Sequence, residues 1–344
     1  MAHGLNPAQH DAVSTLSGPL LVLAGAGTGK TRVVTFRIAE LIRTGTRPDR
    51  ILAVTFTNKA AREMQERVTE LLGRKRKEKP EVSTFHSLCV RILRRHIHHL
   101  GYPRAFAIYD RGDQESIARQ VLREIKVPDS ALRPGDLLAM ISNWKCAAMR
   151  PDDAAYAATS DKEHLAAAGY RKYQKALKAV GAVDFDDLLL VTEELFRKHP
   201  DVRRAEAERF DHLLVDEYQD TNGSQYRIVK ALAEGHRNLC VVGDDDQSIY
   251  AWRGAEVTHI LRFRHDWPEA KIVRLETNYR STHQIIDWAN RLIRFNKTRH
   301  DKTLQATVHG DEPRIIQFED GETEAREVVA NIKSRIAGAG RKPR

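Results

Sequence analysis

Cysteine is scarce in this sequence, and the few cysteines are scattered. The 344 residues include three, Cys89, Cys146 and Cys240, and no two of them form a CxxC pair. A disulfide framework or a structural zinc site needs clustered cysteines at regular spacing. The sequence therefore argues against both, and it predicts small buried thiols in a protein of a reducing compartment.

Long apolar runs are also missing. No apolar stretch approaches the roughly 18 residues that a membrane-spanning helix needs, and the N-terminal stretch MAHGLNPAQH contains no apolar signal segment. Internal repeats and low-complexity blocks are absent as well. We accordingly expect a cytoplasmic protein without a membrane partner.

The charge balance lacks an acidic excess. Lys and Arg number 56 against 47 Asp and Glu, which gives a formal net charge of +9. Such a balance favours an anionic polymer such as nucleic acid as a partner, although it does not prove one. Hydrophobic residues make up 41% of the chain, enough to build cores in about two domains.

One glycine-rich loop lies in the setting that phosphate binding requires. The apolar residues Leu20 to Leu23 predict a buried strand, and Lys30 and Thr31 open a helical pattern after the loop. Glycines let backbone N–H groups converge on phosphate oxygens, and a helix N-terminus attracts an anion. We expect Lys30 to contact the β- and γ-phosphates and Thr31 to ligate Mg²⁺. The rest of the expected cradle is Ala24, where the strictest pattern has glycine, with Gly25, Ala26, Gly27, Thr28 and Gly29.

A pair of carboxylates follows a second buried strand. Leu213 to Val215 form the apolar run, and Asp216 and Glu217 come directly after it. Buried carboxylates are costly unless a cation compensates them. In a nucleotide hydrolase, Asp216 would hold Mg²⁺ and Glu217 would orient and deprotonate the attacking water.

A third strand, Leu239–Val242, leads into the polar segment GDDDQSIYAWRG. Gln247 is placed to sense a γ-phosphate from the neighbouring strand end. Tyr250, Trp252 and Arg253 combine two aromatic rings and a cation, which suits stacking on unpaired bases and a phosphate contact. The alternative is that Tyr250 and Trp252 are core residues.

Alternating strands and helices predict an α/β fold with a mostly parallel sheet. The pattern becomes helix-only from about residue 97 to 181, which predicts an all-α insertion. The carboxylates of the segment Asp184–Leu188 suit either a metal site or a helix N-terminus, and the second interpretation is favoured. Near the end of the chain we expect a strand over Arg314–Phe318 and a helix over 322–336.

Nine segments together resemble the UvrD/Rep/PcrA type of superfamily 1 DNA helicases, and the Rep branch most of all. In chain order they are LNPAQ (5–9), AGAGTGKTR (24–32), AVTFTNKAAREM (53–64), STFHS (83–87), ISNWK (141–145), DFDDLL (184–189), LLVDEYQDTN (213–222), VVGDDDQSIYAWRGA (241–255) and LETNYRS (275–281). The resemblance covers nearly the whole chain.

The resemblance implies an ATP-dependent motor that closes a cleft between two RecA-like lobes and moves 3′ to 5′ along single-stranded DNA. Gln9 would contact the adenine edge, Tyr279 would stack on adenine, and Arg32 would lie by the nucleotide. Gln247 and Arg280 would face the γ-phosphate. The implied DNA contacts are Phe56, Asn58, Thr84, His86, Tyr250, Trp252 and Arg253.

The implied organisation is a first RecA-like lobe over residues 1–96 and 184–275, a helical accessory insertion over 97–183, and the beginning of a second lobe over 276–344. Expected partners are ATP with Mg²⁺, single-stranded DNA, single-strand/double-strand junctions and replication or repair proteins. Family members continue through further motifs, including an arginine finger, that we do not find here. We therefore expect an N-terminal portion without autonomous unwinding activity.

Three alternatives stay open at the level of the sequence. One is the motor lobe of a RecB-like nuclease-helicase. Another is a non-motor module that binds single-stranded DNA and uses ATP only as a conformational ligand. A third, a P-loop NTPase unrelated to nucleic acid, is disfavoured by the Tyr250, Trp252 and Arg253 cluster and by the basic charge balance.

Overall fold

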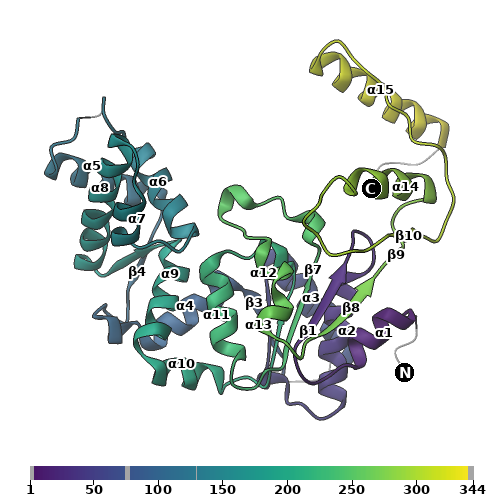
Figure 1. The fold of residues 1–344 in the computed structure, drawn as a ribbon, viewed down its shortest axis with the longest axis horizontal. Coiled ribbons are helices and arrows are strands. Elements are labelled where there is room, and N and C mark those ends of the chain that lie inside the picture. The colour runs from purple at the N-terminus through teal and green to yellow at the C-terminus, as the bar shows by residue number, and fades with distance from the viewer. Residues whose placement is uncertain (1–3, 74–77, 129, 340–344) are drawn as a thin grey trace.

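The computed structural model describes residues 4–73, 78–128 and 130–339, and its centre is a six-stranded sheet (Figure 1). The strand order is β3-β2-β6-β7-β1-β8, and every neighbouring pair is parallel. The strands are β1 (Leu20–Ala24), β2 (Ile51–Thr55), β3 (Glu81–Thr84), β6 (His212–Val215), β7 (Leu239–Gly243) and β8 (Lys271–Leu275). This confirms the predicted α/β class with a parallel sheet.

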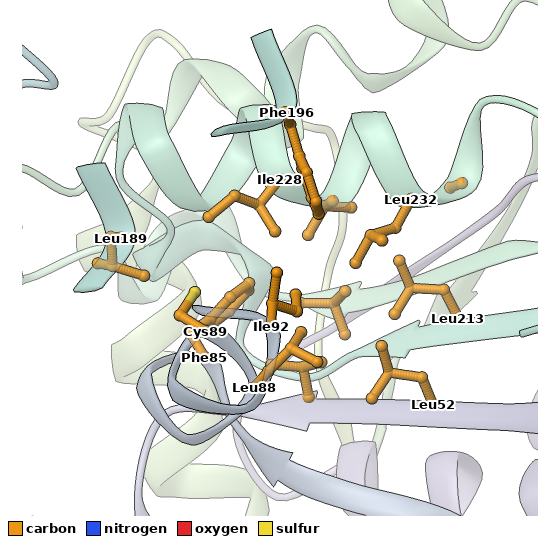
Figure 2. Packing of buried hydrophobic residues seen from close by; sticks show 14 of the residues in the cluster. Leu52, Phe85, Leu88, Cys89, Ile92, Leu189, Phe196, Leu213, Ile228 and Leu232 are labelled. Atoms are coloured by element: carbon orange, nitrogen blue, oxygen red, sulfur yellow. The ribbon is translucent and has the colours of Figure 1, made fainter. Parts of the chain in front are cut away.

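The strands are apolar at successive positions because helices cover both faces of the sheet. Leu21 and Leu23 of β1 point into one core, whereas Leu20 and Val22 point into the other. The first face is covered by α4 (Phe85–His96), α9 (Asp187–Lys198) and α11 (Gly223–Ala233), the second by α2 (Lys30–Arg43) and α3 (Asn58–Leu72). Figure 2 shows the first core, in which Phe85, Ile92 and Ile228 approach strand residues such as Leu213.

A separate helical region lies to one side of the sheet (Figure 1). It has its own apolar core, which includes Leu137, Tyr170 and Leu177. Its helices are α5 (Arg111–Glu124), α6 (Pro134–Cys146), α7 (Pro151–Ala157) and α8 (Asp161–Ala179). The two short strands that enter and leave it, β4 (Ala107–Tyr109) and β5 (Ala182–Asp184), pair in parallel.

A buried ion pair joins the helical region to the sheet region. Lys145 of α6 places its ammonium 2.6 Å from Asp184 and 2.7 Å from Asp187. Asp184 also accepts a hydrogen bond from the backbone N–H of Asp187 at 2.9 Å, at the start of α9. The helix-start interpretation of these acids is therefore confirmed, and the cation that they hold is a lysine.

The remaining elements are short or lie at the ends of the chain. They are α1 (Pro7–Ser14), α10 (Pro200–Ala207), α12 (Thr258–Leu261), α13 (Phe263–Asp266), α14 (His283–Ile293), α15 (Gly321–Ala339), β9 (Thr277–Asn278), β10 (Gln305–Ala306), and the 3₁₀ turns η1 (Pro48–Arg50), η2 (Ile97–Leu100), η3 (Tyr218–Asp220), η4 (Asp245–Gln247) and η5 (Ala251–Arg253). None of the helices in the described part of the chain is long and apolar enough to cross a membrane.

Of the two elements expected near the end of the chain, the helix is confirmed and the strand is wrong. The predicted helix over 322–336 is confirmed by α15, which extends beyond it at both ends. The predicted strand over Arg314–Phe318 is wrong, because this stretch has no regular structure. Ile315 and Ile316 are 85% and 60% exposed. A strand needs a neighbour for its backbone hydrogen bonds, and no described strand lies beside this segment.

Candidate nucleotide and nucleic-acid site

The glycine-rich loop connects β1 to α2 at the carboxyl edge of the sheet, where α/β folds place their ligands. Gly27 and Gly29 adopt φ angles of +69° and +93°, which side chains disfavour. A Cβ atom on Gly27 would lie 2.6 Å from the Cβ of Arg280. Both glycines are therefore favoured by the backbone conformation, and Gly27 is also required by the close approach of Asn278 and Arg280.

Neighbouring groups hold the loop through its carbonyl oxygens. Gln9 donates to the carbonyl of Thr28 at 2.8 Å, and the Thr28 hydroxyl donates to the carbonyl of Gly25 at 2.8 Å. The Asn278 amide donates to the carbonyl of Ala26 at 2.6 Å, and the backbone N–H of Tyr279 donates to that of Gly27 at 2.9 Å. Carbonyl oxygens that would repel a phosphate are thus already paired.

Gln9 has a structural task in this arrangement. It is 2% exposed, and its side chain also accepts a hydrogen bond from the backbone N–H of Asn6 at 3.1 Å. Asn6 in turn donates to the hydroxyl of Tyr279 at 2.9 Å. Tyr279 is 53% exposed, so its side chain is partly open to solvent beside the loop. The expected adenine contacts of Gln9 and Tyr279 stay predictions, and Arg32 and Arg280 lie exposed near the same loop.

The carboxylate pair meets the loop lysine. Lys30 places its ammonium 2.6 Å from a carboxylate oxygen of Glu217. Glu217, the second residue after β6, adopts the left-handed conformation with φ +51°, and its side chain reaches the loop lysine. Such a conformation is uncommon for a residue other than glycine and is concentrated at functional sites. The structure therefore brings together two residues that the sequence assigned to one site, and their roles toward ATP stay predictions.

Asp216, which precedes Glu217 in the chain, is buried and 4% exposed. Burial, followed by the nearby charge of Glu217, raises the pKa of Asp216 to about 7. Its described hydrogen bond comes from the backbone N–H of Glu217 at 3.0 Å. The Asp216 carboxylate is buried and has a single donor among the described residues, and the Thr31 hydroxyl lies at the same edge of the sheet. Both groups are hard oxygen ligands. These residues fit Mg²⁺, which binds through few protein oxygens plus phosphates and waters.

Gln219 links the carboxylate pair to the next strand end, and sequence reasoning missed it. Its side-chain amide donates to Glu217 at 3.0 Å, and its carbonyl accepts from the backbone N–H of Asp244 at 3.0 Å. Asp244 in turn accepts a hydrogen bond from the side-chain amide of Gln247. Gln219 is 2% exposed. A glutamine that is buried must pair both ends of its amide, but the sequence alone does not show that it is buried.

The aromatic cluster after η4 is on the surface. Tyr250 and Trp252 are 40% and 69% exposed, so the alternative that they belong to the core is wrong. The Arg253 guanidinium lies 4.6 Å from the ring centre of Trp252 and 6.0 Å from that of Tyr250. The arrangement presents two open rings and a cation, as base stacking and phosphate contact require.

The other expected DNA contacts lie at the ends of β2 and β3 and differ in exposure. Asn58 is exposed at the start of α3, and Phe56 is half-buried with its ring centre 5.9 Å from that of Phe85. Thr84 is buried, and its hydroxyl accepts from the backbone N–H of Ser87 at 3.2 Å, which caps α4. The side chain of Thr84 therefore positions the helix, and its contact with DNA stays a prediction.

His86 forms a second aromatic platform together with Phe185, which sequence reasoning did not propose as a contact. Their rings are stacked with centres 3.9 Å apart. Burial lowers the pKa of His86 to about 4, so its ring is neutral at physiological pH. Phe185 is 53% exposed. The only signal for it in the sequence is an aromatic residue among the carboxylates of Asp184–Leu188.

A parallel sheet with a glycine-rich loop after β1 and an acid pair after β6 defines a RecA-like P-loop lobe. Comparison with known families makes the class more specific. The UvrD/REP helicase N-terminal domain matches residues 5–268, and the UvrD-like helicase C-terminal domain matches residues 273–342. The chain belongs to the UvrD/REP helicase family.

Several relatives are named ATP-dependent DNA helicase PcrA. The protein from Leuconostoc citreum is 45% identical over 335 residues, which cover 97% of this chain and 45% of the relative. The Bacillus subtilis (strain 168) protein is 46% identical over 322 residues, which cover 93% of this chain and 43% of the relative. The chain spans less than half the length of these relatives. The expected affinity to the Rep branch stays a prediction.

Proposed function

We propose that this chain is the ATP- and single-stranded-DNA-binding part of a helicase that couples ATP hydrolysis to 3′-to-5′ movement on single-stranded DNA. One observation carries the proposal. The loop that presents Tyr250, Trp252 and Arg253 follows β7, and β7 lies between β1, which leads to Lys30, and β6, which leads to Glu217. A base-stacking surface thus adjoins both halves of a phosphate-binding site.

The residues at the carboxyl edge of the sheet would each make a different contact with ATP or Mg²⁺. The backbone of Gly25–Gly29 would cradle the phosphates, with Lys30 on the β- and γ-phosphates and Tyr279 stacked on adenine. Thr31 and Asp216 would hold Mg²⁺, which when bound neutralises developing phosphate charge. Glu217 would take the proton of the attacking water. Gln9, Arg32, Gln247 and Arg280 would complete the nucleotide contacts.

The DNA path would run over the loops that follow β2, β3 and β7. Bases would stack on Trp252 and Tyr250 and on the Phe185–His86 pair, and Arg253 would contact a phosphate. Phe56 and Asn58 would border the path, and Thr84 would shape it through its helix cap. We expect junction DNA and replication or repair proteins as partners of the whole protein in the cytoplasm.

The domain organisation is part of the proposal. We assign residues 1–96 and 184–275 to a first motor lobe, 97–183 to a helical insertion and 276–344 to the beginning of a second lobe. The separate core of the helical region supports the insertion. The change of family domain between residues 268 and 273 supports the second boundary.

Steady-state ATP hydrolysis, measured with and without excess single-stranded oligonucleotide, tests the proposal. We expect DNA to stimulate hydrolysis, and we expect Glu217→Gln to bind nucleotide normally while its rate falls by about 10²–10⁴, the usual contribution of a general base. Lys59→Ala, an exposed lysine on α3, is the matched control for Lys30→Ala, which should lose phosphate binding. ATP binding without any turnover would instead favour the non-motor module.

A further inference from the structure

Three consecutive aspartates, Asp244, Asp245 and Asp246, converge after β7 so that their carboxylate oxygens lie within 4.8 Å of one another. Asp244 and Asp245 are buried residues, at 3% and 8% exposure. A cluster of this kind resembles a cation site. The position of the cation is taken by Lys302, whose ammonium lies 2.9 Å, 2.7 Å and 2.6 Å from the three carboxylates in turn.

Further donors from the same distant segment complete the cluster. Arg299 binds both oxygens of Asp246 at 2.8 Å and 2.7 Å, and the backbone N–H of His300 donates to Asp245 at 2.6 Å. We call this set the clasp: Asp244, Asp245 and Asp246 with Arg299 and Lys302. An ammonium has three donors, and here each one has a carboxylate. Lys302 is 6% exposed, so water does not compete for it.

The pKa shifts agree with the geometry. Burial acts against the charge of Lys302, but the three aspartates outweigh it and raise the pKa of Lys302. Burial likewise acts against the charge of Asp245, but hydrogen bonds from His300 and Lys302 lower its pKa. Both shifts favour the charged forms of Lys302 and Asp245. Removal of Lys302 would leave buried carboxylates facing one another. Such unpaired charges are strongly unfavourable.

One side of the clasp connects to the nucleotide-binding edge. Asp244 binds Lys302, receives the Gln247 amide and donates its backbone N–H to Gln219. Gln219 reaches Glu217, and Glu217 pairs with Lys30. An unbroken series of polar contacts thus runs from the phosphate-binding lysine to Lys302.

The other side connects to the surface that would bind DNA and to the segment after the sheet. The Ser248 hydroxyl donates to the backbone carbonyl of Gln219 at 3.2 Å, and Ser248 lies two residues before Tyr250. Lys302 precedes β10, which pairs with β9, and β9 leads into Tyr279. The clasp therefore lies where the nucleotide edge, the aromatic loop and the C-terminal segment meet.

We propose that Lys302 is a positioning residue that couples nucleotide binding to single-stranded DNA binding by holding the Asp244–Gln247 turn in register with both sites. This inference rests on the proposed function. Coupling is a measurable ratio, namely the DNA dissociation constant without nucleotide divided by that with nucleotide. Thermodynamic linkage requires DNA to change nucleotide affinity by the same factor.

The experiment measures this ratio by fluorescence anisotropy of a labelled oligothymidylate with and without Mg²⁺ and AMP-PNP. In the unaltered chain we expect a ratio that differs from one by about 5- to 150-fold, the usual range of coupling. In Lys302→Gln we expect a ratio within about 2-fold of one, while each ligand alone binds within about 3-fold of its normal affinity. Lys302→Arg should recover part of the coupling. Lys297→Gln, an exposed lysine of the same segment, should keep all of it.

The outcomes separate the two proposals. If the unaltered chain binds neither AMP-PNP nor DNA, the proposed function fails and this inference fails with it. If both bind but the ratio is one, or if Lys302→Gln keeps the full ratio, the coupling role of Lys302 is overturned and the proposed function stands. Should Lys302→Gln not fold, Arg299→Gln removes the two hydrogen bonds to Asp246. The same ratio of DNA dissociation constants, measured in that variant, then tests the coupling role of the clasp.

Discussion

The central sheet and the segment that follows it are held in place by different forces. Every residue of β1 is buried, and apolar cores cover both faces of the sheet. Among the described residues of 276–339, the buried apolar side chains are Ile286 and Ala306, whereas Leu292 and Phe295 are 72% and 79% exposed. This segment joins the sheet region mainly through polar contacts from Asn278, Tyr279 and Lys302.

The difference shows how one chain can combine a part that is costly to disturb with a part that is held by weaker contacts. Breaking an apolar core exposes surface at a cost of about 25 cal/mol per Å². A hydrogen bond exchanged for one to water or to a ligand changes stability by only about 0.5–1.5 kcal/mol. The sheet is therefore the fixed frame, whereas the hydrogen bonds made by Asn278 and Tyr279 can be exchanged at a lower cost in free energy.

The largest effect should come from the core of the sheet region. Phe85, 1% exposed, lies in the first core together with Leu52 of β2 and Leu213 of β6 (Figure 2). Phe85→Ala should lower the free energy of unfolding by about 3–5 kcal/mol, because it removes a large buried ring and leaves a cavity. Leu292→Ala, on the exposed face of α14, should change it by less than about 0.5 kcal/mol. Denaturant unfolding measures both, and equal losses would contradict the comparison.

A smaller effect should separate binding from stability within the sheet region. Trp252→Ala should weaken affinity for single-stranded oligonucleotide by about 1–3 kcal/mol, the contribution of one base stack. Because the ring is exposed, the thermal unfolding transition should stay unchanged. Titration of a labelled oligonucleotide at two salt concentrations checks the first part. A loss of stability with unchanged DNA affinity would instead indicate that Trp252 contributes to packing and does not bind DNA.

The hydrogen bonds of Asn278, which attach the C-terminal segment to the glycine-rich loop, should contribute a comparable free energy to stability. Asn278 is 1% exposed, donates to the carbonyl of Ala26, and accepts from the backbone N–H groups of Arg280 and Ser281. Asn278→Ala leaves these groups unpaired and should cost about 1–3 kcal/mol. Hydrogen exchange should report the loss over residues 277–281 and leave β6 and β7 protected. Asn296→Ala, at an exposed position, is the control, and uniform loss of protection would argue against a separable attachment.

The last effect concerns the pH dependence of stability. The pKa of His86 falls to about 4 in the folded chain because of burial, against an ordinary value of 6.5. Between these values the unfolded chain binds a proton that the folded chain does not, so stability falls as pH falls. The slope attributable to this group is at most about 1.4 kcal/mol per pH unit. His86→Gln should flatten the loss between pH 6.5 and 4, and an unchanged slope would assign it to other buried histidines.

Much of this protein could be predicted from local pattern. The apolar runs at Leu20–Leu23 and Leu213–Val215 are strands, and the loop, the acid pair and α15 lie where the sequence placed them. These features depend on residues within one turn or one strand of each other. The strand over Arg314–Phe318 was wrong because a β-branched, apolar run becomes a strand only beside another strand.

The sequence by itself determined the class of the fold and the conformation of the glycine-rich loop, because hydrophobic periodicity and glycine conformation are properties of neighbouring residues. Tertiary structure alone decided that Gln219 joins Glu217 to Asp244, that Phe185 stacks on His86, and that Lys302 takes the place of a cation among three aspartates. These contacts join residues between 2 and 99 positions apart, and the burial that makes a polar group depend on one partner arises only when the chain has packed.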